Sequence, residues 1–224
     1  MTSRLEVAIQ AEKDRVKEFG EEITPPPESM PGWVDKARAL VVQIFPEDFR
    51  QARLTDFPEI SLSDLDWTRF GFCLRGIPGI GKTHLATAIA KEYFRPTHPQ
   101  TIWTGNGYDR QTSASWVSVP MLLCRINATF GKKTGESSYD ILEQMIKYKL
   151  LVLDDLGAEK ETEFASSMIY SLISERRNKH RVTIITTNQT LEEIDGWEAR
   201  IASRLAEMAT VTLPEVDRRI RDEK

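Results

Sequence analysis

A glycine-rich segment, GIPGIGKT from Gly76 to Thr83, constrains the fold more than any other part of this 224-residue chain. It fits the pattern G-x-x-x-x-G-K-T, and it lies between an apolar run at Phe70–Leu74 and a run with helical spacing. Glycines let the backbone curl so that successive N–H groups point at one phosphate, and the N-terminus of the following helix adds partial positive charge. The segment therefore predicts a strand–loop–helix unit that binds nucleotide phosphates.

Each residue type in this loop has an expected task. Lys82 is expected to reach the outer phosphates of ATP, and the Thr83 hydroxyl is expected to bind Mg²⁺. The complete predicted cofactor-binding set is Gly76, Ile77, Pro78, Gly79, Ile80, Gly81, Lys82, Thr83 and His84. We therefore expect ATP and Mg²⁺ as cofactors.

A second element, KLLVLDDLG, places two acidic residues after four apolar ones. In open α/β sheets, ligands bind at the carboxyl ends of the strands, where Asp154 and Asp155 would lie. Asp154 is predicted to hold Mg²⁺ together with Thr83. Asp155 is predicted to orient or deprotonate the attacking water. The alternative for both is a solvated acidic turn after a core strand.

A third element, VTIITTNQT, ends a further apolar run in polar residues. Asn188 at its tip is predicted to hold the attacking water or the γ-phosphate. From the residues alone, an ordinary turn residue is the favoured interpretation of Asn188.

Apolar runs alternate with helical periodicity along most of the chain. The predicted strands are Phe70–Leu74, Trp116–Val119, Leu150–Leu153, Val182–Thr186 and Val211–Leu213; the predicted helices are Thr83–Phe94, Pro120–Phe130, Ile141–Lys149, Glu161–Lys179 and Ala199–Met208. Strands that are apolar throughout and separated by helices indicate a parallel sheet covered on both faces. The predicted fold class is α/β, a P-loop domain with a five-stranded parallel sheet.

The N-terminal part has a different composition. Helical spacing near Leu5–Phe19 and near Trp33–Ile44 flanks the proline-rich run Ile23–Gly32, which favours an extended linker. We predict a helical arm at residues 1–49, used for partner docking, and an ATPase domain at residues 50–224. The turn-rich stretch Arg95–Ser115, with a candidate strand at Thr101–Thr104, has no assigned task.

Composition excludes several function classes. Residues 1–48 hold six Lys and Arg against ten Asp and Glu, whereas the remainder holds equal numbers of each sign. The chain as a whole therefore lacks the basic footprint of a nucleic-acid-binding protein. Cys73 and Cys124 lie in apolar runs and are expected to be buried free thiols. No run is apolar and long enough for a membrane span or a signal peptide, so a cytoplasmic protein is expected.

At this point the sequence resembles the bacterial helicase loaders of the DnaC type, within the AAA+ superfamily, from about Phe45 to its end. The resemblance rests on FPEDFRQARLTDF, GIPGIGKTHLA, WVSVPMLLCRINATF, LLVLDDLG, TTN and RIASRLAEM. In that family the GKT loop is the Walker A motif, the DD strand end is the Walker B motif, and the asparagine after TT is sensor 1. The resemblance supports Asn188 as a catalytic residue, and implies that no helical lid domain follows.

The resemblance also implies an assembly. Members form a ring or spiral with ATP between subunits, and Arg204 would be the arginine finger that reaches the neighbour's γ-phosphate, with Arg200 a weaker candidate. A replicative helicase and single-stranded DNA are the implied partners, with Arg125, Lys132 and Lys133 as the available basic groups for DNA. The alternative is a transposition regulator of the IstB type, which shares the ATPase core but binds duplex DNA and recruits a transposase. The acidic arm favours the loader.

Overall fold

The computed structural model describes residues 44–93, 114–130, 135–158 and 162–214. Five parallel strands form one sheet in the order β2-β3-β4-β1-β5. The strands are β1 (Gly71–Arg75), β2 (Ala114–Ser118), β3 (Leu150–Leu156), β4 (Val182–Thr187) and β5 (Ala209–Thr212). This is the predicted fold class, and all five predicted strands are confirmed within a few residues at each end.

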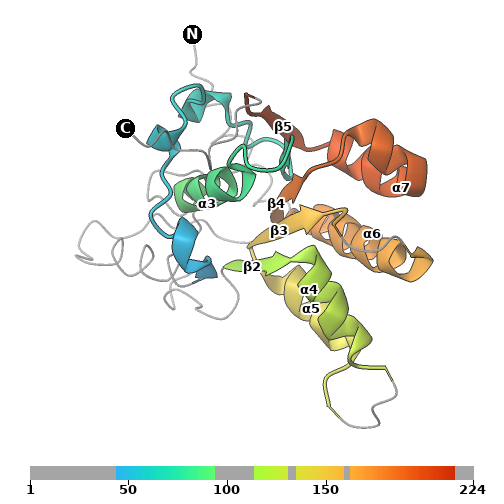
Figure 1. The fold of residues 1–224 in the computed structure, drawn as a ribbon. Coiled ribbons are helices and arrows are strands. Elements are labelled where there is room, and N and C mark those ends of the chain that lie inside the picture. The colour runs from blue at the N-terminus through green and yellow to red at the C-terminus, as the bar shows by residue number, and fades with distance from the viewer. Residues whose placement is uncertain (1–43, 94–113, 131–134, 159–161, 215–224) are drawn as a thin grey trace, which may run out of the picture.

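Helices cover both faces of the sheet, and they divide unequally between them (Figure 1). The helix α3 (Lys82–Tyr93) packs on one face together with residues 44–65, which we call the leading segment. The other face carries α4 (Val119–Asn127), α5 (Ser138–Lys147), α6 (Glu163–Asn178) and α7 (Leu191–Ala206). No helix among the described residues is long and apolar enough to cross a membrane.

Alternation along each central strand produces the two cores. In β3, Leu150 and Val152 face the α3 side, whereas Leu151 and Leu153 face the α4–α7 side. Successive side chains of a strand point to opposite faces, so a strand covered on both sides must be apolar at every position. This requirement explains the uninterrupted apolar runs in the sequence.

The leading segment is tied to α3 by polar contacts as well as by burial. Phe45 and Phe57 are buried in the same core cluster as α3. Lys91 Nζ donates hydrogen bonds to the carbonyls of Arg50 (2.5 Å) and Ala52 (2.7 Å). Residues 44–49, which the sequence assigns to the arm, thus pack with the sheet domain, whereas residues 1–43 lie outside the described residues. The division into an arm and an ATPase domain, and the docking role of the arm, stay predictions.

A fully buried arginine joins α5 and α6 to the start of β4. Arg176 donates to the carbonyls of Met145 and Tyr148, both at 2.7 Å, to that of Val182 at 2.5 Å, and to the Thr183 hydroxyl at 2.9 Å. Burial lowers the pKa of Arg176 to about 9, which still leaves it charged at neutral pH. The guanidinium thus caps the C-terminal carbonyls of α5, where helix carbonyls have no partner in their own helix.

Two expectations differ from the structure. The helix predicted at Ala199–Met208 begins eight residues earlier, at Leu191, and has a non-helical residue, Glu198, inside it. Cys73 is buried, and burial raises the pKa of its thiol to about 12, but Cys124 is exposed. The expected burial of Cys124 was wrong because α4 directs Leu122, Leu123 and Ile126 to the core and Cys124 away from it.

Candidate nucleotide-binding site

The predicted phosphate loop connects β1 to α3. Three of its glycines, Gly76, Gly79 and Gly81, have positive φ values of 146°, 90° and 94°. Such backbone angles are readily adopted only by glycine. Ile80 is fully buried beneath the loop, and a Cβ at Gly76 would lie 2.3 Å from Ile80 Cδ1. Glycine is therefore required at Gly76 on grounds of both angle and space.

Lys82 is held by the loop that it is expected to serve. Its Nζ donates to the carbonyl of Gly76 at 2.7 Å and to that of Ile77 at 2.8 Å, and the side chain is buried. The ammonium group is thus positioned over the loop, as a phosphate-binding lysine must be.

Thr83 and Asp154 meet although they are 71 positions apart. The Thr83 hydroxyl lies 3.0 Å from Asp154 Oδ1 and 3.2 Å from Oδ2. Asp154 is only 4% exposed, and burial raises the pKa of its carboxyl above the ordinary 3.8. The charge of Asp155 raises that pKa further, whereas hydrogen bonds from Thr186 and Thr83 lower it.

A bulge in β3 places the two aspartates in different environments. The register runs Leu153↔Ile185 and then Leu156↔Thr187, so two residues of β3 oppose the single residue Thr186 of β4. Asp155, the extra residue, has a φ of 60° and is exposed, whereas Asp154 is buried. Bulges of this kind re-aim side chains next to active sites.

Thr186 holds this bulge and was not predicted as a site residue. Its hydroxyl donates to Asp154 Oδ1 at 2.6 Å and accepts from the backbone N–H of Asp155 at 2.9 Å. In the sequence it was counted only as the last residue of an apolar strand. The same strand also contains Thr183 and Thr187, so nothing in the sequence distinguishes Thr186 from these two residues.

These residues fit a magnesium–triphosphate group. A hydroxyl and a buried carboxylate within hydrogen-bond distance are oxygen ligands of the kind that Mg²⁺ prefers, directly or through water. Thr83 and Asp154 would hold the ion, which would neutralise charge on the phosphates. Among the described residues, no group of three or more His, Cys, Asp or Glu could bind a metal by itself.

The side chain of His84 points to the leading segment. Its Nε2 lies 2.7 Å from Asp56 Oδ2, and its ring makes edge contacts with Phe49 and Phe57, with centroids 6.3 and 5.5 Å away. A contact of His84 with phosphate would therefore come from its backbone in the first turn of α3. That role stays a prediction.

Asn188 follows β4 directly and is exposed. Because β4 lies between β1 and β3, its carboxyl end is next to both the phosphate loop and the end of β3. The strand order thus supports the predicted location of Asn188, while its contact with water or phosphate stays a prediction.

Arg204 lies on α7 and contacts α6 rather than the phosphate loop. Its Nη1 is 2.5 Å from Glu207 Oε1, and its Nε is 3.4 Å from the Ser174 hydroxyl. Arg200 pairs with Glu198, with Nε to Oε1 at 2.8 Å, and its guanidinium lies 4.8 Å from the ring centre of Tyr170. Neither arginine makes a described contact with Lys82 or Asp154 of the same subunit.

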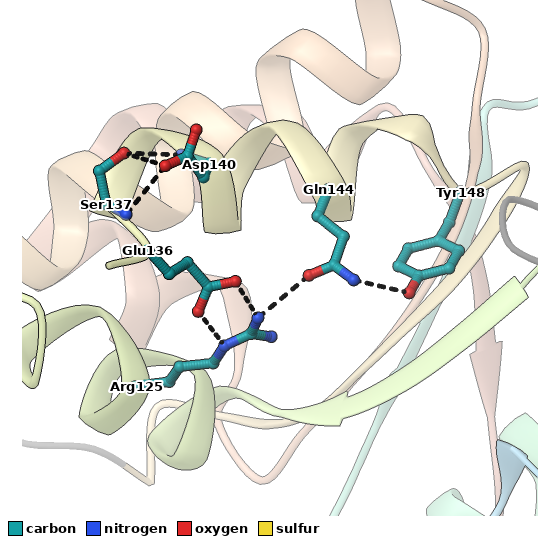
Figure 2. A network of polar contacts seen from close by, with 6 residues as sticks. All are labelled: Arg125, Glu136, Ser137, Asp140, Gln144 and Tyr148. Atoms are coloured by element: carbon teal, nitrogen blue, oxygen red, sulfur yellow. Dashed lines mark hydrogen bonds and ion pairs between the residues drawn. The ribbon is translucent and has the colours of Figure 1, made fainter. Parts of the chain in front are cut away.

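Arg125 is less available for DNA than its sequence position suggested. Figure 2 shows it in an ion pair with Glu136, with Nε to Oε2 at 3.0 Å, and hydrogen-bonded to Gln144 at 3.1 Å. Gln144 in turn donates to the Tyr148 hydroxyl at 3.4 Å. The charge of Arg125 is thus compensated, and the network braces α4 against α5. Lys132 and Lys133 lie outside the described residues.

The sheet order, the phosphate loop and the paired Thr83 and Asp154 define a P-loop nucleotide-binding protein of the AAA+ type. Comparison with known proteins agrees with this class. A family model described as "IstB-like ATP binding protein" matches residues 40–214. The chain belongs to this family.

The chain is also similar to individual curated proteins and solved structures. The replicative helicase loader DnaC of Escherichia coli K12 is 26% identical over 133 residues, which is 59% of this chain and 48% of DnaC. The chain thus matches about half the length of this curated relative. The crystal structures of the DnaC helicase loader and of DnaI each superpose with a TM-score of 0.55 at 21% identity. The DnaC structure covers 75% of this chain and 100% of its own chain. The DnaI structure covers 80% of this chain and 98% of its own chain. Both superpositions confirm the fold.

We predict that Asp154→Asn stabilises the nucleotide-free protein at neutral pH. The raised pKa of Asp154 means that its charged form costs stability. That cost is absent below the ordinary pKa of 3.8, grows as the pH rises toward the higher folded-state value, and is complete at neutral pH. The free energy of unfolding in urea, measured for both proteins across this range, should differ by on the order of 1 kcal/mol at pH 7.5 and converge in acid. A variant that is less stable than the parent at pH 7.5 would contradict this.

We predict that Asp155→Asn retains ATP binding and lowers turnover at least a hundredfold, the usual contribution of a general base. Asparagine tolerates the positive φ of this position, so the bulge should persist. Phosphate release at saturating ATP and ATP affinity are the two measurements. Asp48→Asn, an exposed carboxylate of the leading segment, is the matched control. Normal turnover in Asp155→Asn would assign the activation of water to another group.

Proposed function

We propose that this protein is an ATP hydrolase whose sites are completed by a neighbouring subunit. The observation that carries the proposal is that Arg204 makes no described contact with the phosphate site of its own chain. The phosphate loop, Thr83 and Asp154 converge, whereas Arg204 is held on α7 by Ser174 and Glu207. An arginine that stabilises the transferring phosphoryl group would therefore come from another copy.

The proposed binding of ATP and its cation also has physical support. Lys82 already lies over the loop, and Asp154 is a buried carboxylate whose hydrogen bonds come only from hydroxyl groups among the described contacts. A triphosphate and its cation would satisfy both charges. Lys82 would bind the outer phosphates, Asp155 would accept a proton from water, and Asn188 would orient that water.

Mixing two inactive variants tests the shared site. Arg204→Ala should bind ATP nearly as well as the parent but hydrolyse it about a thousandfold more slowly, because an arginine finger acts on charge that develops in the transition state. Lys82→Ala should fail to bind ATP. A mixture can form interfaces that pair an intact loop with an intact Arg204, so part of the phosphate release should return and increase with protein concentration.

Two comparisons sharpen this experiment. Arg200→Ala mixed with Lys82→Ala shows which of the two arginines acts, and Lys179→Ala, an exposed residue after α6, is the surface control. Mixed oligomers are verified by differently tagged subunits. Mixed oligomers that form without any recovery of activity would refute a shared site.

We propose further that the ATPase serves as a loader for a replicative helicase. The named relatives are replication loaders, and the acidic residues 1–48 suit a protein partner better than a phosphate backbone. The arm would dock the helicase while the ATPase domain forms the ring or spiral.

Deleting residues 1–39 tests the arm. This boundary keeps the whole segment that the family model matches, including Phe45, which packs in the core. The truncated chain should fold and bind ATP with unchanged affinity but no longer co-purify with the replicative helicase of its host. Helicase binding that survives the deletion would place the docking surface on the ATPase domain.

Single-stranded DNA is the proposed nucleic-acid partner, and α4 and α5 offer a surface for it. Three large apolar side chains on and around these helices are strongly exposed: Met121 at 66%, Phe130 at 58% and Tyr139 at 71%. Unpaired bases stack on exposed aromatic rings, and this contact does not need a strongly basic surface. With Arg125 paired to Glu136, stacking gains importance relative to charge.

Tyr139→Ala should therefore weaken binding to single-stranded DNA at least fivefold, the lower end of the ~1–3 kcal/mol that one stacked base contributes. The slope of affinity against salt concentration should not change, because no charge is removed. Tyr139→Phe keeps the ring and is the matched control. By contrast, changing Lys132 and Lys133 together to Glu removes positive charge and should flatten the dependence of DNA affinity on salt concentration. Unchanged affinity in Tyr139→Ala, measured by fluorescence anisotropy, would exclude this ring from the interface.

The family description favours a second candidate, a transposition regulator of the IstB type. This function predicts tighter binding to duplex than to single-stranded DNA and recruitment of a transposase rather than a helicase. The same anisotropy measurement with duplex and single strands separates the two candidates.

A further inference from the structure

One amide connects the end of β3 to α7. Gln189 follows Asn188, and its side chain packs directly on Gly157, because a Cβ at Gly157 would lie 2.4 Å from Gln189 Oε1. The indole Nε1 of Trp197 donates to that same Oε1 at 3.0 Å. A single side chain thus touches both the loop after Asp155 and the helix that carries the arginines.

The backbone of Gln189 is fixed to β3 as well. The Thr187 hydroxyl donates to the carbonyl of Leu156 at 2.7 Å and accepts from the N–H of Gln189 at 3.1 Å. Gln189 therefore follows any displacement of the end of β3, both through its main chain and through its contact with Gly157.

Trp197 lies directly before a break in α7. Glu198 has a φ of −154° and a ψ of 83°, so the helix consists of two halves joined at this residue. The Glu198 carboxylate accepts from the backbone N–H of Arg200 at 3.2 Å, as an N-cap residue does for a helix that starts anew. The second half can thus change direction relative to Trp197 without loss of helical hydrogen bonds in either half.

Arg200 and Arg204 are both on this second half, and Trp197 anchors the first half in the core beneath. The contacts form a continuous physical chain from Asp155 and Gly157 through Gln189 and Trp197 to the break at Glu198. Energetic coupling between distant sites is carried by such chains of packed and hydrogen-bonded groups.

We propose that the hydrogen bond between Gln189 and Trp197 couples nucleotide occupancy at the end of β3 to the direction in which α7 presents Arg204. The inference rests on the proposed function of Arg204 at a neighbour's site. A bound cation and triphosphate would take the Thr83 hydroxyl away from Asp154, and the resulting shift of the bulged end of β3 reaches Trp197 through the Gln189 amide. Gln189 and Trp197 are positioning residues and touch no reacting atom.

Tryptophan emission tests the coupling within one subunit. The chain has five tryptophans, so the signal of Trp197 is the difference between the parent and Trp197→Phe. Addition of Mg·ATP should change this difference signal, and Gln189→Met, which removes the acceptor at similar size, should abolish the change. Gln144→Met and Trp67→Phe are matched controls elsewhere in the fold and should preserve it. A Trp197 signal that ignores Mg·ATP, or that still responds in Gln189→Met, would overturn the proposal.

A mixing experiment tests the effect on Arg204. The Asp155→Asn subunit retains ATP binding and contributes Arg204 to the interface. The Arg204→Ala subunit contributes the intact phosphate loop, Asp154 and Asp155. Adding Trp197→Phe to the Asp155→Asn subunit should lower the recovered turnover roughly tenfold, since small misplacements of a catalytic group have effects of this size or larger. Adding it to the Arg204→Ala subunit should change turnover by less than about twofold.

The two placements of Trp197→Phe distinguish a failure of the coupling from a failure of the shared site. Equal losses in both placements, accompanied by a lower melting temperature, would show a merely structural role and overturn the proposal. No recovery even without Trp197→Phe would refute the shared site itself, and the coupling is then decided by the emission measurement alone. Gln189→Met combined with Trp197→Phe should lower the recovered turnover no more than either change alone, because both substitutions remove the same hydrogen bond.

Discussion

Thr186 donates a hydrogen bond to Asp154 and accepts one from the backbone of Asp155, and these two bonds hold the bulged end of β3 against β4. A bulge leaves ladder groups unpaired, and an unpaired buried polar group costs roughly 1–3 kcal/mol. The hydroxyl supplies the missing partner, so that one residue can be inserted without loss of the sheet. The insertion directs Asp154 inward to Thr83 and leaves Asp155 exposed. The different environments of these two adjacent aspartates therefore depend on the Thr186 hydroxyl.

The site brings opposite charges together, because burial raises the pKa of the Asp154 carboxyl and the positive charge of Lys82 lowers it. Asp154 is buried among hydroxyl groups, and Lys82 bonds to carbonyls of its own loop. Hydrogen bonds to neutral partners do not fully offset the loss of hydration around a charge. A ligand that brings phosphate oxygens to Lys82 and a cation to Asp154 stabilises the folded state by its binding free energy. Nucleotide affinity and folding stability are therefore linked at this site.

The sequence predicted those features that depend on local pattern. Continuous apolar runs located all five strands, and glycine spacing located the phosphate loop, because both follow from requirements on adjacent residues. The bulge could not be predicted, since it depends on which residue of β4 lies opposite Asp154. Arg176 is one of three basic residues near the end of α6, and the sequence does not distinguish it; it is nevertheless fully buried, and the carbonyls that it binds come from the end of α5 and from β4. The first half of α7 was missed because Gly196 and the acidic residues around it weaken the helical pattern.

The contacts of Arg204 within its own subunit suit the role proposed for it at a neighbouring subunit. In the folded subunit Arg204 is paired with Glu207, and Glu207 also binds Arg177, with Nε to Oε2 at 2.5 Å. If Arg204 turns toward a neighbour's phosphate, Glu207 keeps Arg177 and is not left as an unpaired charge. Arg204 therefore loses one partly exposed ion pair, which is worth at most about 1 kcal/mol, together with its contacts with Ser174 and Tyr170 on α6. An arginine held by a shared carboxylate is ordered enough to avoid a large entropic cost on docking, and weakly enough bound to be released.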